Sequence, residues 1–582
     1  MPTVTINGKA CEFTEGQMIL QVANEQGIEI PQYCFHDGLS RPAQCRICLA
    51  ECWAPNPRND NKLEPFMGGK LLPTCTTPAS DGMVVHTDSP KAVANQKAVM
   101  EYLLINHPLD CPVCDQAGEC FLQDYSYKYG RSTSRFEETK VKQPKKDLGP
   151  HVYLYADRCI MCTRCVRFDR EVAGADQIMI GGRGNKSEID VFPGVALDNE
   201  LSANVIDLCP VGALLDKDFL FTQRVWFLRS TPSIDPITAS GDNILVEHNE
   251  GKIYRVKPRE NASVNHWWIT DEVRYGWKFV HAENRLRSPM HRRFGALDEC
   301  DFNRAYDDAI DGIRKNTEGK RLALLVSPML PCEEAYALAT LAREIDPDAL
   351  IGVGPVPVQG EDKVFPPAAS REDGFVMYAE KAPNARGVRR VLRGVTGSDP
   401  LEFNDWLGKL GGAGAAIVTG NYPSQWASDE LIDALGSTFT VLIDTLGSAL
   451  IESADVVLPG ATFAEKAGTF ENARGMIQAF EQAIPLIELA KSEGQIAFDL
   501  LAEFRGTETK GPDIEDLVIV DEQPGQVPAA RTTQRPRAEL FNAGTIRARM
   551  SEQHPELGVF VTEVAMPKVD VRQRADVEVV EL

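Results

Sequence analysis

The chain has 582 residues, and at about 150 residues per domain this length predicts roughly four domains. Hydrophobic residues make up 43% of the sequence, charged residues 25% and aromatic residues 8%, which indicates folded globular domains and excludes disordered, collagen-like and small disulfide-stapled chains. The net charge of −23 argues against nucleic acid or an anionic membrane surface as the main partner.

Residues 1–78 predict a small mixed domain. Strand-like sequence starts at residues 3–6 and 11–13, and a helix is expected from about Gln17 to Gln26. The N-terminus has neither the pattern of a secretory signal nor that of a transit peptide, and no run of 18 apolar residues occurs in the chain. We therefore expect a cytoplasmic protein.

A second segment, residues 79–150, contains a helix signal. Ser89 is a typical N-cap residue, and Pro90 suits the first helical position. Apolar residues then recur at helical spacing: Val93, Val99, Met100, Leu103 and Leu104. This helix brings the chain to His107. The polar stretch 140–146 is expected to be a solvated linker.

The rest of the chain divides into three parts. Residues 151–221 form a third cysteine-rich segment. Between residues 222 and 505, short apolar runs at 322–326, 415–418 and 441–444 alternate with helix-like stretches, which is an α/β pattern. Residues 506–582 turn polar, and we interpret them as a C-terminal tail with isolated β-type patches at 559–562 and 577–580.

Cysteine is concentrated at one end, because 13 of the 15 cysteines lie within the first 209 residues. In a reducing compartment this density favours metal or redox chemistry over disulfides. Spacing separates eleven of the cysteines and one histidine into three candidate ligand sets. The cysteines outside the sets are Cys11, Cys52, Cys300 and Cys332, and we expect Cys11 and Cys52 to be packed thiols.

The first set contains Cys34, Cys45, Cys48 and Cys75. Three thiolates on one loop and a fourth from a distant segment suit a 2Fe-2S cluster, in which four anionic sulfur ligands surround two irons. Small residues between Cys34 and Cys48 allow backbone amides to point at the cluster sulfurs. A structural zinc site with four cysteine ligands is the alternative at this spacing.

The second set contains His107, Cys111, Cys114 and Cys120. Three cysteines and one histidine satisfy either tetrahedral zinc or a 4Fe-4S cluster with one imidazole ligand. His107 has a second interpretation, as a histidine that binds the free carbonyl groups at the end of a helix. The sequence alone leaves these alternatives open.

The third set contains Cys159, Cys162, Cys165 and Cys209, the last followed directly by Pro210. A tight cysteine triplet with a remote Cys-Pro is close to the bacterial ferredoxin pattern and predicts a 4Fe-4S cluster. A thioredoxin-like redox pair needs only one Cys-x-x-Cys on a strand-to-helix turn, so three thiols in series argue against it. Zinc is again the alternative.

No other motif indicates a cofactor or a catalytic site. The glycine-rich stretch 181–187 does not meet the phosphate-loop spacing, and 411–414 precedes a strand where a dinucleotide-binding loop would follow one. We therefore expect neither FMN nor NAD on this chain, and no catalytic residue. The acidic excess is expected to be mostly solvated surface. Three clusters without a substrate site predict an electron-transfer protein.

In this order, the three sets closely resemble the family of the large iron-sulfur subunit of respiratory complex I, known as the G subunit or the 75 kDa subunit of NADH-quinone oxidoreductase. The resemblance covers residues 1 to about 290 and rests most specifically on HPLDCPVCDQAGEC, CIMCTRCVRF, GGRGNKSEI and NVIDLCPVGAL. It implies a ferredoxin-like β-grasp domain with one 2Fe-2S cluster on the Cys34 set. It also implies two 4Fe-4S clusters, one on the His107 set and one on the Cys159 set.

Residues 222–505 resemble the molybdopterin-oxidoreductase-like α/β domain of this family, through NEGKIYRVKPR at 249–259 and ADVVLPGATF at 454–463. Some relatives carry an extra 4Fe-4S cluster at the start of that domain. Here residues 230–237 contain no cysteine, and Thr270 stands where the later cysteine would be. We therefore expect a retained fold without the extra cluster and without molybdenum.

The resemblance implies a subunit of an ion-translocating NADH:quinone reductase. Electrons would arrive from a flavin-bearing, NADH-oxidising partner, pass from the Cys34 set to the Cys159 set and then the His107 set, and leave to iron-sulfur partners near the quinone. The subunit would lie on the cytoplasmic side of the plasma membrane, with other subunits translocating ions.

Two other functions stay open. The first is the iron-sulfur and molybdopterin subunit of an NAD-linked formate dehydrogenase or an NAD-reducing hydrogenase, for which Cys332 is the only candidate molybdenum ligand, with no companion ligand near it in sequence. The second is a zinc-stabilised scaffold without electron transfer.

Overall fold

The computed structural model describes residues 1–506 and 539–567. The chain divides into two compact units. Unit 1 contains residues 1–228, 266–271 and 364–375, and unit 2 contains residues 229–265, 272–363 and 376 onward. No helix in the described ranges is long and apolar enough to cross a membrane.

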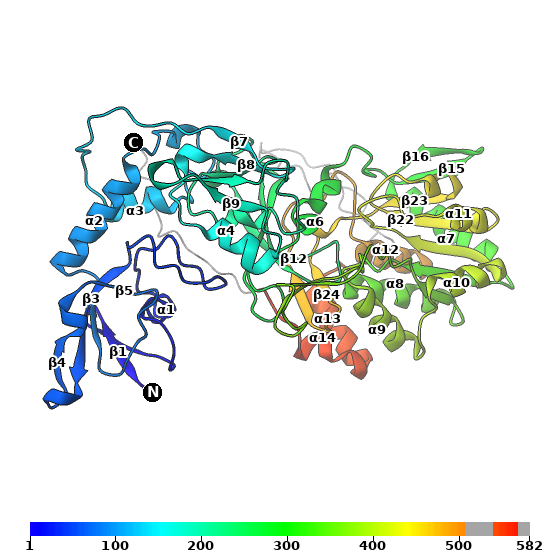
Figure 1. Cartoon of the computed structure of the whole chain (residues 1–582). Coiled ribbons are helices and arrows are strands. Elements are labelled where there is room, and N and C mark those ends of the chain that lie inside the picture. Colours follow the sequence, from blue (N-terminus) through cyan, green and yellow to red (C-terminus); the bar gives the residue numbers. More distant parts are fainter. Residues whose placement is uncertain (507–538, 568–582) are drawn as a thin grey trace, which may run out of the picture. The chain divides into compact units, whose positions relative to one another are not determined.

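Unit 1 begins with a mixed sheet of six strands in the order β2-β1-β6-β3-β4, with β5 paired to β3 (Figure 1). The strands are β1 (Thr3–Ile6), β2 (Lys9–Glu12), β3 (Leu49–Asn56), β4 (Lys62–Pro65), β5 (Leu72–Pro73) and β6 (Val84–His86). Helix α1 (Ile19–Glu25) buries its apolar side against this sheet. The expected strand at residues 3–6 and the expected helix are confirmed. Cys11 and Cys52 lie in the core of this sheet, as expected.

The second segment of unit 1 contains helices α2 (Pro90–Leu104) and α3 (Phe121–Tyr129). The predicted start of α2 is confirmed, because the Ser89 side chain accepts a hydrogen bond from the Ala92 amide at 3.3 Å and Pro90 is the first helical residue. A short 3-10 turn, η3 (Cys111–Val113), stands between the two helices. The residues of the second set lie between the end of α2 and the start of α3, with Cys111 in this turn.

The third segment is built on a sheet in the order β11-β8-β7 and a separate hairpin of β9 and β10. The strands are β7 (Lys145–Asp147), β8 (Val152–Tyr155), β9 (Ile178–Gly181), β10 (Glu188–Val191) and β11 (Leu214–Asp216). Two short helices, α4 (Arg164–Phe168) and α5 (Asn204–Leu208), accompany them. The expected linker at 140–146 is partly wrong, because its last residues pair with β8 as the first residues of β7.

Unit 2 contains a seven-stranded sheet in the order β16-β15-β23-β22-β21-β17-β18 (Figure 1). Its strands are β15 (Met290–Arg293), β16 (Ala296–Glu299), β17 (Arg321–Val326), β18 (Leu350–Val353), β21 (Ala413–Thr419), β22 (Phe439–Asp444) and β23 (Val456–Pro459). Five of these strands, β18, β17, β21, β22 and β23, run parallel to one another. In chain order they follow the 2-1-3-4-5 arrangement of doubly wound sheets, whose switch point lies between β17 and β21.

Alternate residues of the central strands face opposite helix layers. The helices are α7 (Phe302–Asn316), α8 (Cys332–Ile345), α9 (Ala385–Thr396), α10 (Phe403–Lys409), α11 (Asp429–Leu435) and α12 (Glu493–Phe504). In β17, Leu322 and Leu324 belong to the core formed with α7, α8 and α12, whereas Ala323 and Leu325 belong to the core formed with α10 and α11. Burial on both faces explains the continuous apolar runs, and the three expected strands are confirmed.

Smaller elements complete the chain. A three-stranded sheet contains β12 (Arg229–Ile234), β13 (Asn243–Asn249) and β14 (Lys252–Pro258). Two strand pairs are β19 (Lys363–Phe365) with β20 (Phe375–Met377), and β24 (Gly468–Glu471) with β25 (Ile477–Phe480). Helix α6 spans Asp271–Tyr275.

Part of the expected tail folds into unit 2 as helices α13 (Ala543–Gln553) and α14 (Val559–Thr562). Ile546, Met550 and Phe560 are fully buried in the core shared with α8 and α12. The expected β-type patch at 559–562 is therefore wrong: Leu557 and Phe560, nearly one helical turn apart, both enter this core. The patch expected at 577–580 lies outside the described residues.

Candidate metal-cluster sites

The structure arranges the first set as two thiol pairs. The Sγ atoms of Cys34 and Cys45 are 3.4 Å apart, and those of Cys48 and Cys75 are 3.7 Å apart. Two sulfur ligands of one tetrahedral metal, each about 2.3 Å from it, lie about 3.7 Å from each other. Each pair therefore has the spacing that one iron of a 2Fe-2S cluster requires. This pairing is not evident from the sequence.

Each pair also contains one thiol that ionises easily. The hydrogen bond from Cys34 lowers the pKa of Cys45 to about 5, and the same bond raises the pKa of Cys34. The contact between Cys48 and Cys75 likewise lowers the pKa of Cys48 and raises that of Cys75. Since thiolates are the metal-binding form, the lowered pKa values of Cys45 and Cys48 favour metal binding at one thiol of each pair.

The third set surrounds one cavity. Cys159, Cys162, Cys165 and Cys209 all line this cavity, and most of its other lining residues are apolar. The backbone on both sides of Cys162 takes a left-handed conformation, with φ of 54° at Met161 and 62° at Thr163. These two reversals bring the cysteine triplet to one side of the chain. Remote Cys209 reaches the cavity from the end of α5.

Burial in this cavity disfavours free thiolates. It raises the pKa of Cys159 to about 12 and that of Cys162 to about 11, and it also raises the pKa values of Cys165 and Cys209. Four thiolates in an apolar cavity need bound positive charge, which the irons of a cluster supply. The donor set and its apolar lining therefore both suit a 4Fe-4S cluster.

The second set lies around the turn that follows α2. Cys114 and Cys120 are buried, and Cys111 is exposed. Burial lowers the pKa of His107 to about 4, with Arg158 and Lys140 acting in the same direction, so its imidazole is neutral at pH 7. The neutral form is the one that binds metal. Gly212 allows this packing, because a Cβ there would come within 2.2 Å of the Cys114 Sγ atom.

Within residues 1–506 and 539–567, no three His, Cys, Asp or Glu side chains are placed to hold a single metal ion. With four protein ligands, a 2Fe-2S cluster needs two per iron and a 4Fe-4S cluster needs one per iron.

Three buried arginines accompany the cysteine sets, and the sequence reasoning missed all of them. Arg158, Arg164 and Arg167 are 2%, 7% and 4% exposed. The Arg158 Nη2 atom donates to Asp110 Oδ2 at 2.9 Å, beside the second set, while Cys159 follows Arg158 in the third set. Each arginine lies within two residues of a cysteine, and this repeated spacing was the signal available in the sequence.

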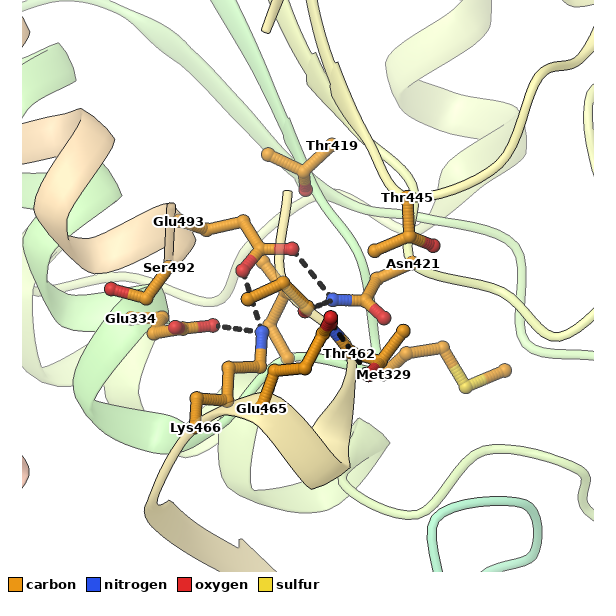
Figure 2. Close-up of polar contacts among 12 residues, drawn as sticks. Met329, Glu334, Thr419, Asn421, Thr445, Thr462, Glu465, Lys466, Ser492 and Glu493 are labelled. Atoms are coloured by element: carbon orange, nitrogen blue, oxygen red, sulfur yellow. Dashed lines mark hydrogen bonds and ion pairs between the residues drawn. The ribbon is translucent and has the colours of Figure 1, made fainter. Parts of the chain in front are cut away.

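Unit 2 has a polar site where doubly wound sheets bind ligands, at the carboxyl ends of β17 and β21. Figure 2 shows Lys466 between Glu334 and Glu493. The Lys466 Nζ atom lies 2.7 Å from Glu334 Oε2 and 2.6 Å from Glu493 Oε2. Asn421, just after β21, donates from Nδ2 to Glu493 Oε1 at 2.6 Å. Lys466, Glu334 and Glu493 are all buried.

Charge within this cluster is largely neutralised by its own members. Burial raises the pKa of Glu334 to about 8, against the opposing effect of Lys466. Burial acts to lower the pKa of Lys466, but the two acids together outweigh it and raise that pKa. The cluster is tightly packed, because a Cβ at Gly460 would come within 2.7 Å of Glu493 Oε1. Cys332, at the start of α8, is fully buried and contacts Asn384 at 3.5 Å.

Five stretches of the chain match known protein families. They are described as a 2Fe-2S iron-sulfur cluster binding domain (residues 1–90), an NADH-ubiquinone oxidoreductase-G iron-sulfur binding region (96–135), an NADH-quinone oxidoreductase subunit 3, ferredoxin-like domain (149–215), an NADH-ubiquinone oxidoreductase NDSU1/NuoG-like, 4Fe-4S domain (228–278) and a molybdopterin oxidoreductase (409–503). The chain therefore contains both 2Fe-2S and 4Fe-4S binding domains. The stretch 228–278 contains no cysteine.

Curated relatives match the chain over most of its length. The G subunit of NADH-quinone oxidoreductase from Rickettsia conorii is 29% identical over 607 residues, which covers 86% of this chain and 87% of that protein. The chain belongs to the family of NADH-quinone oxidoreductase G subunits. Two further members are the Rickettsia felis G subunit, 36% identical over 346 residues, and the 78 kDa mitochondrial NADH-ubiquinone oxidoreductase subunit of Neurospora crassa, 37% identical over 351 residues.

Coverage differs among these family members. The alignments to the Rickettsia felis and Neurospora crassa proteins cover 59% and 60% of this chain, but only 49% and 45% of those proteins. The chain thus spans about half the length of several relatives it matches. A solved NAD+-reducing [NiFe]-hydrogenase chain is 28% identical, with a TM-score of 0.34 over 38% of this chain and 91% of that one, and this likeness is too small to argue from.

Proposed function

We propose that this chain is the iron-sulfur electron-transfer subunit in the peripheral arm of an NADH:quinone oxidoreductase. The observation that carries the proposal is the collection of eleven cysteines and His107 into three sets within unit 1. Each cluster supplies one-electron transfer when bound. The chain itself provides the ligands, the apolar surroundings and the nearby cations that hold these groups.

The ligand assignment follows the three sets. Cys34, Cys45, Cys48 and Cys75 hold a 2Fe-2S cluster, supported by the two thiol pairs. Cys159, Cys162, Cys165 and Cys209 hold a 4Fe-4S cluster, supported by their shared cavity. His107, Cys111, Cys114 and Cys120 hold the second 4Fe-4S cluster, supported by the placement of all four between the end of α2 and the start of α3.

Electrons enter at the Cys34 set, pass to the Cys159 set and leave from the His107 set. Contacts between neighbouring residues support this order, because residues beside the third set meet residues beside both of the others. The Gln44 side chain, next to Cys45, donates to the Met161 carbonyl at 2.6 Å. On the other side, Arg158 Nη1 donates to the Gly212 carbonyl at 3.4 Å, and Gly212 packs on Cys114.

The partners follow from this route. Electrons come from a flavin-bearing subunit that oxidises NADH and leave toward iron-sulfur subunits near the quinone. The chain is then a peripheral part of a membrane complex, on its cytoplasmic side, and other subunits translocate ions. Unit 2 serves as a scaffold and docking surface without molybdenum, because buried ion pairs fill its switch point.

Metal analysis of the purified complex tests the proposal. We expect about ten irons for this chain, matched by acid-labile sulfide, without zinc or molybdenum. The iron of the complex is compared with that of variants lacking one ligand of each set, so that each set accounts for its own cluster. Stoichiometric molybdenum would favour the formate dehydrogenase function, and zinc in place of iron would favour a scaffold.

A further inference from the structure

Two buried arginines of unit 1 lie between the first and third cysteine sets. Arg164 and Arg167 both belong to α4, on either side of Cys165. Arg167 Nη2 donates to the Cys34 carbonyl at 2.5 Å and approaches the Cys162 carbonyl at 3.5 Å. One guanidinium group therefore contacts the backbone of a ligand cysteine in both sets.

Arg164 has the same arrangement nearly one helical turn earlier. Its Nη2 atom donates to the Phe35 carbonyl at 2.5 Å, and its Nη1 atom donates to the Leu208 carbonyl at 3.4 Å. Phe35 directly follows Cys34, and Leu208 directly precedes Cys209. Two positive charges thus lie side by side between the proposed 2Fe-2S and 4Fe-4S positions.

Neither arginine forms a hydrogen bond or ion pair with a carboxylate in the part of the chain that the structure describes. Their hydrogen-bond acceptors are carbonyl groups and, for Arg167 Nε, the Thr163 hydroxyl at 3.4 Å. A buried cation without a counter-charge is strongly unfavourable. Ligand cysteines of the first and third sets flank the two guanidinium groups, so the sulfur ligands of a bound cluster would supply negative charge beside this pair.

We propose that Arg164 and Arg167 form a cationic bridge that raises the reduction potential of the clusters on both the Cys34 set and the Cys159 set. The inference rests on the ligand assignment proposed above. When one electron crosses the bridge, one side is oxidised and the other is reduced, no bond forms or breaks, and no proton moves. Because the bridge lies beside both sets, it stabilises negative charge on either side.

The test is an EPR-monitored redox titration of the assembled complex carrying Arg167→Gln or Arg164→Gln. Glutamine keeps an amide donor but removes the charge, so we expect reduction of both clusters to become about tenfold less favourable. For a one-electron couple this factor is about 59 mV. Arg167→Lys and Arg164→Lys keep the charge and should leave both potentials close to those of the native complex.

Arg170→Gln is the matched control, because Arg170 is exposed and lies one helical turn beyond Arg167. It should move neither potential measurably. Equal potentials in the native complex and both glutamine variants would overturn the proposal. A lysine variant that shifts as far as its glutamine counterpart would also overturn it, because hydrogen bonding rather than charge would then set the potentials.

Loss of clusters is informative as well. If a glutamine variant loses a cluster, the other arginine supplies the comparison. If both glutamine variants lose a cluster, the lysine variants decide. Lysine variants that retain both clusters at native potentials support the role of the charge. Lysine variants that also lose a cluster would overturn the proposal and leave the arginines a purely structural role. Failure of the ligand assignment is recognised separately, because the native complex would then lack one of the two EPR signals.

Discussion

Units 1 and 2 treat buried charge in opposite ways. In unit 1, Arg164 and Arg167 lie buried among cysteine sets and bind carbonyl groups, with no carboxylate partner in the described residues. In unit 2, Lys466 lies between Glu334 and Glu493 at ion-pair distances. Unit 1 therefore leaves two buried cations to be balanced by the cysteine ligands and a bound cluster, whereas unit 2 balances most of its charge internally.

A fold can therefore provide a typical ligand-binding position at which no ligand binds. The doubly wound sheet of unit 2 offers a switch point at the ends of β17 and β21, but Asn421, Lys466 and Glu493 bond to one another there. In unit 1, the four cysteines of the third set line one pocket and form no ion pair with one another. Unmatched buried groups indicate function more directly than fold does.

We expect the largest effect from removing one cysteine of the His107 set, the last set of the proposed electron route. In the assembled complex, Cys111→Ala should abolish quinone reduction, beyond the roughly 10- to 100-fold losses that follow changes around a metal site. NADH should still reduce the Cys34 and Cys159 clusters, as EPR would show. Cys300→Ala is the control. Normal quinone reduction without the His107-set cluster would mean that this cluster is off the route.

Substitutions of His107 test whether this histidine holds a cluster in unit 1. His107→Cys should keep a cluster but change its EPR spectrum and potential, because a thiolate replaces a neutral imidazole. His107→Ala should lose the cluster or leave one iron open. His86→Ala, outside the sets, is the control. Spectra and potentials of every cluster that stay unchanged in His107→Ala would make this histidine a structural residue.

Lys466→Met tests whether the charges of unit 2 complete one another. It removes the cation between Glu334 and Glu493, and breaking a buried ion pair costs about 3–5 kcal/mol. Hydrogen exchange in β21 and β22 of the full chain should report this loss, while all cluster spectra stay native. Arg287→Met removes one partner of an exposed pair and should cost less than about 1 kcal/mol. Equal costs for both variants would contradict the assigned role.

Local patterns predicted much of this fold. The cap at Ser89 and the strands of the unit 2 sheet depend on residues near one another in sequence, and so do the cysteine spacings. The β-type interpretation of 559–562 failed because a run of β-branched and aromatic residues resembles a strand until its packing partners are known.

Contacts between residues far apart in the sequence could not be predicted from local patterns. Arg167 meets Cys34 across 133 residues, and Lys466 meets Glu334 across 132 residues. Charged residues in a sequence are normally solvated, so the general expectation of a mostly solvated acidic surface gave no sign that Glu334 and Glu493 are buried. Both charge arrangements appear only when the fold brings the partners together.

The pH dependence of unit 2 provides the smallest test of the comparison. Burial raises the pKa of Glu334 to about 8, so the folded chain keeps this proton to a higher pH than the unfolded chain does. The free energy of unfolding must then fall as pH rises toward 8, and this group contributes at most about 1.4 kcal/mol per pH unit to that fall. Glu334→Gln fixes the neutral form and should flatten the dependence between about pH 6 and 8, measured by hydrogen exchange in β21 and β22.

The control for this test lies on the same helix. The hydrogen bond from Arg505 lowers the pKa of Glu344, which is therefore ionised over this whole range in both the folded and the unfolded chain. Glu344→Gln should leave the slope of stability against pH as it is in the native chain. A Glu334→Gln slope equal to the native one would show that Glu334 is already ionised at pH 6. Lys466 would then face two carboxylates, and unit 2 would retain a buried negative charge.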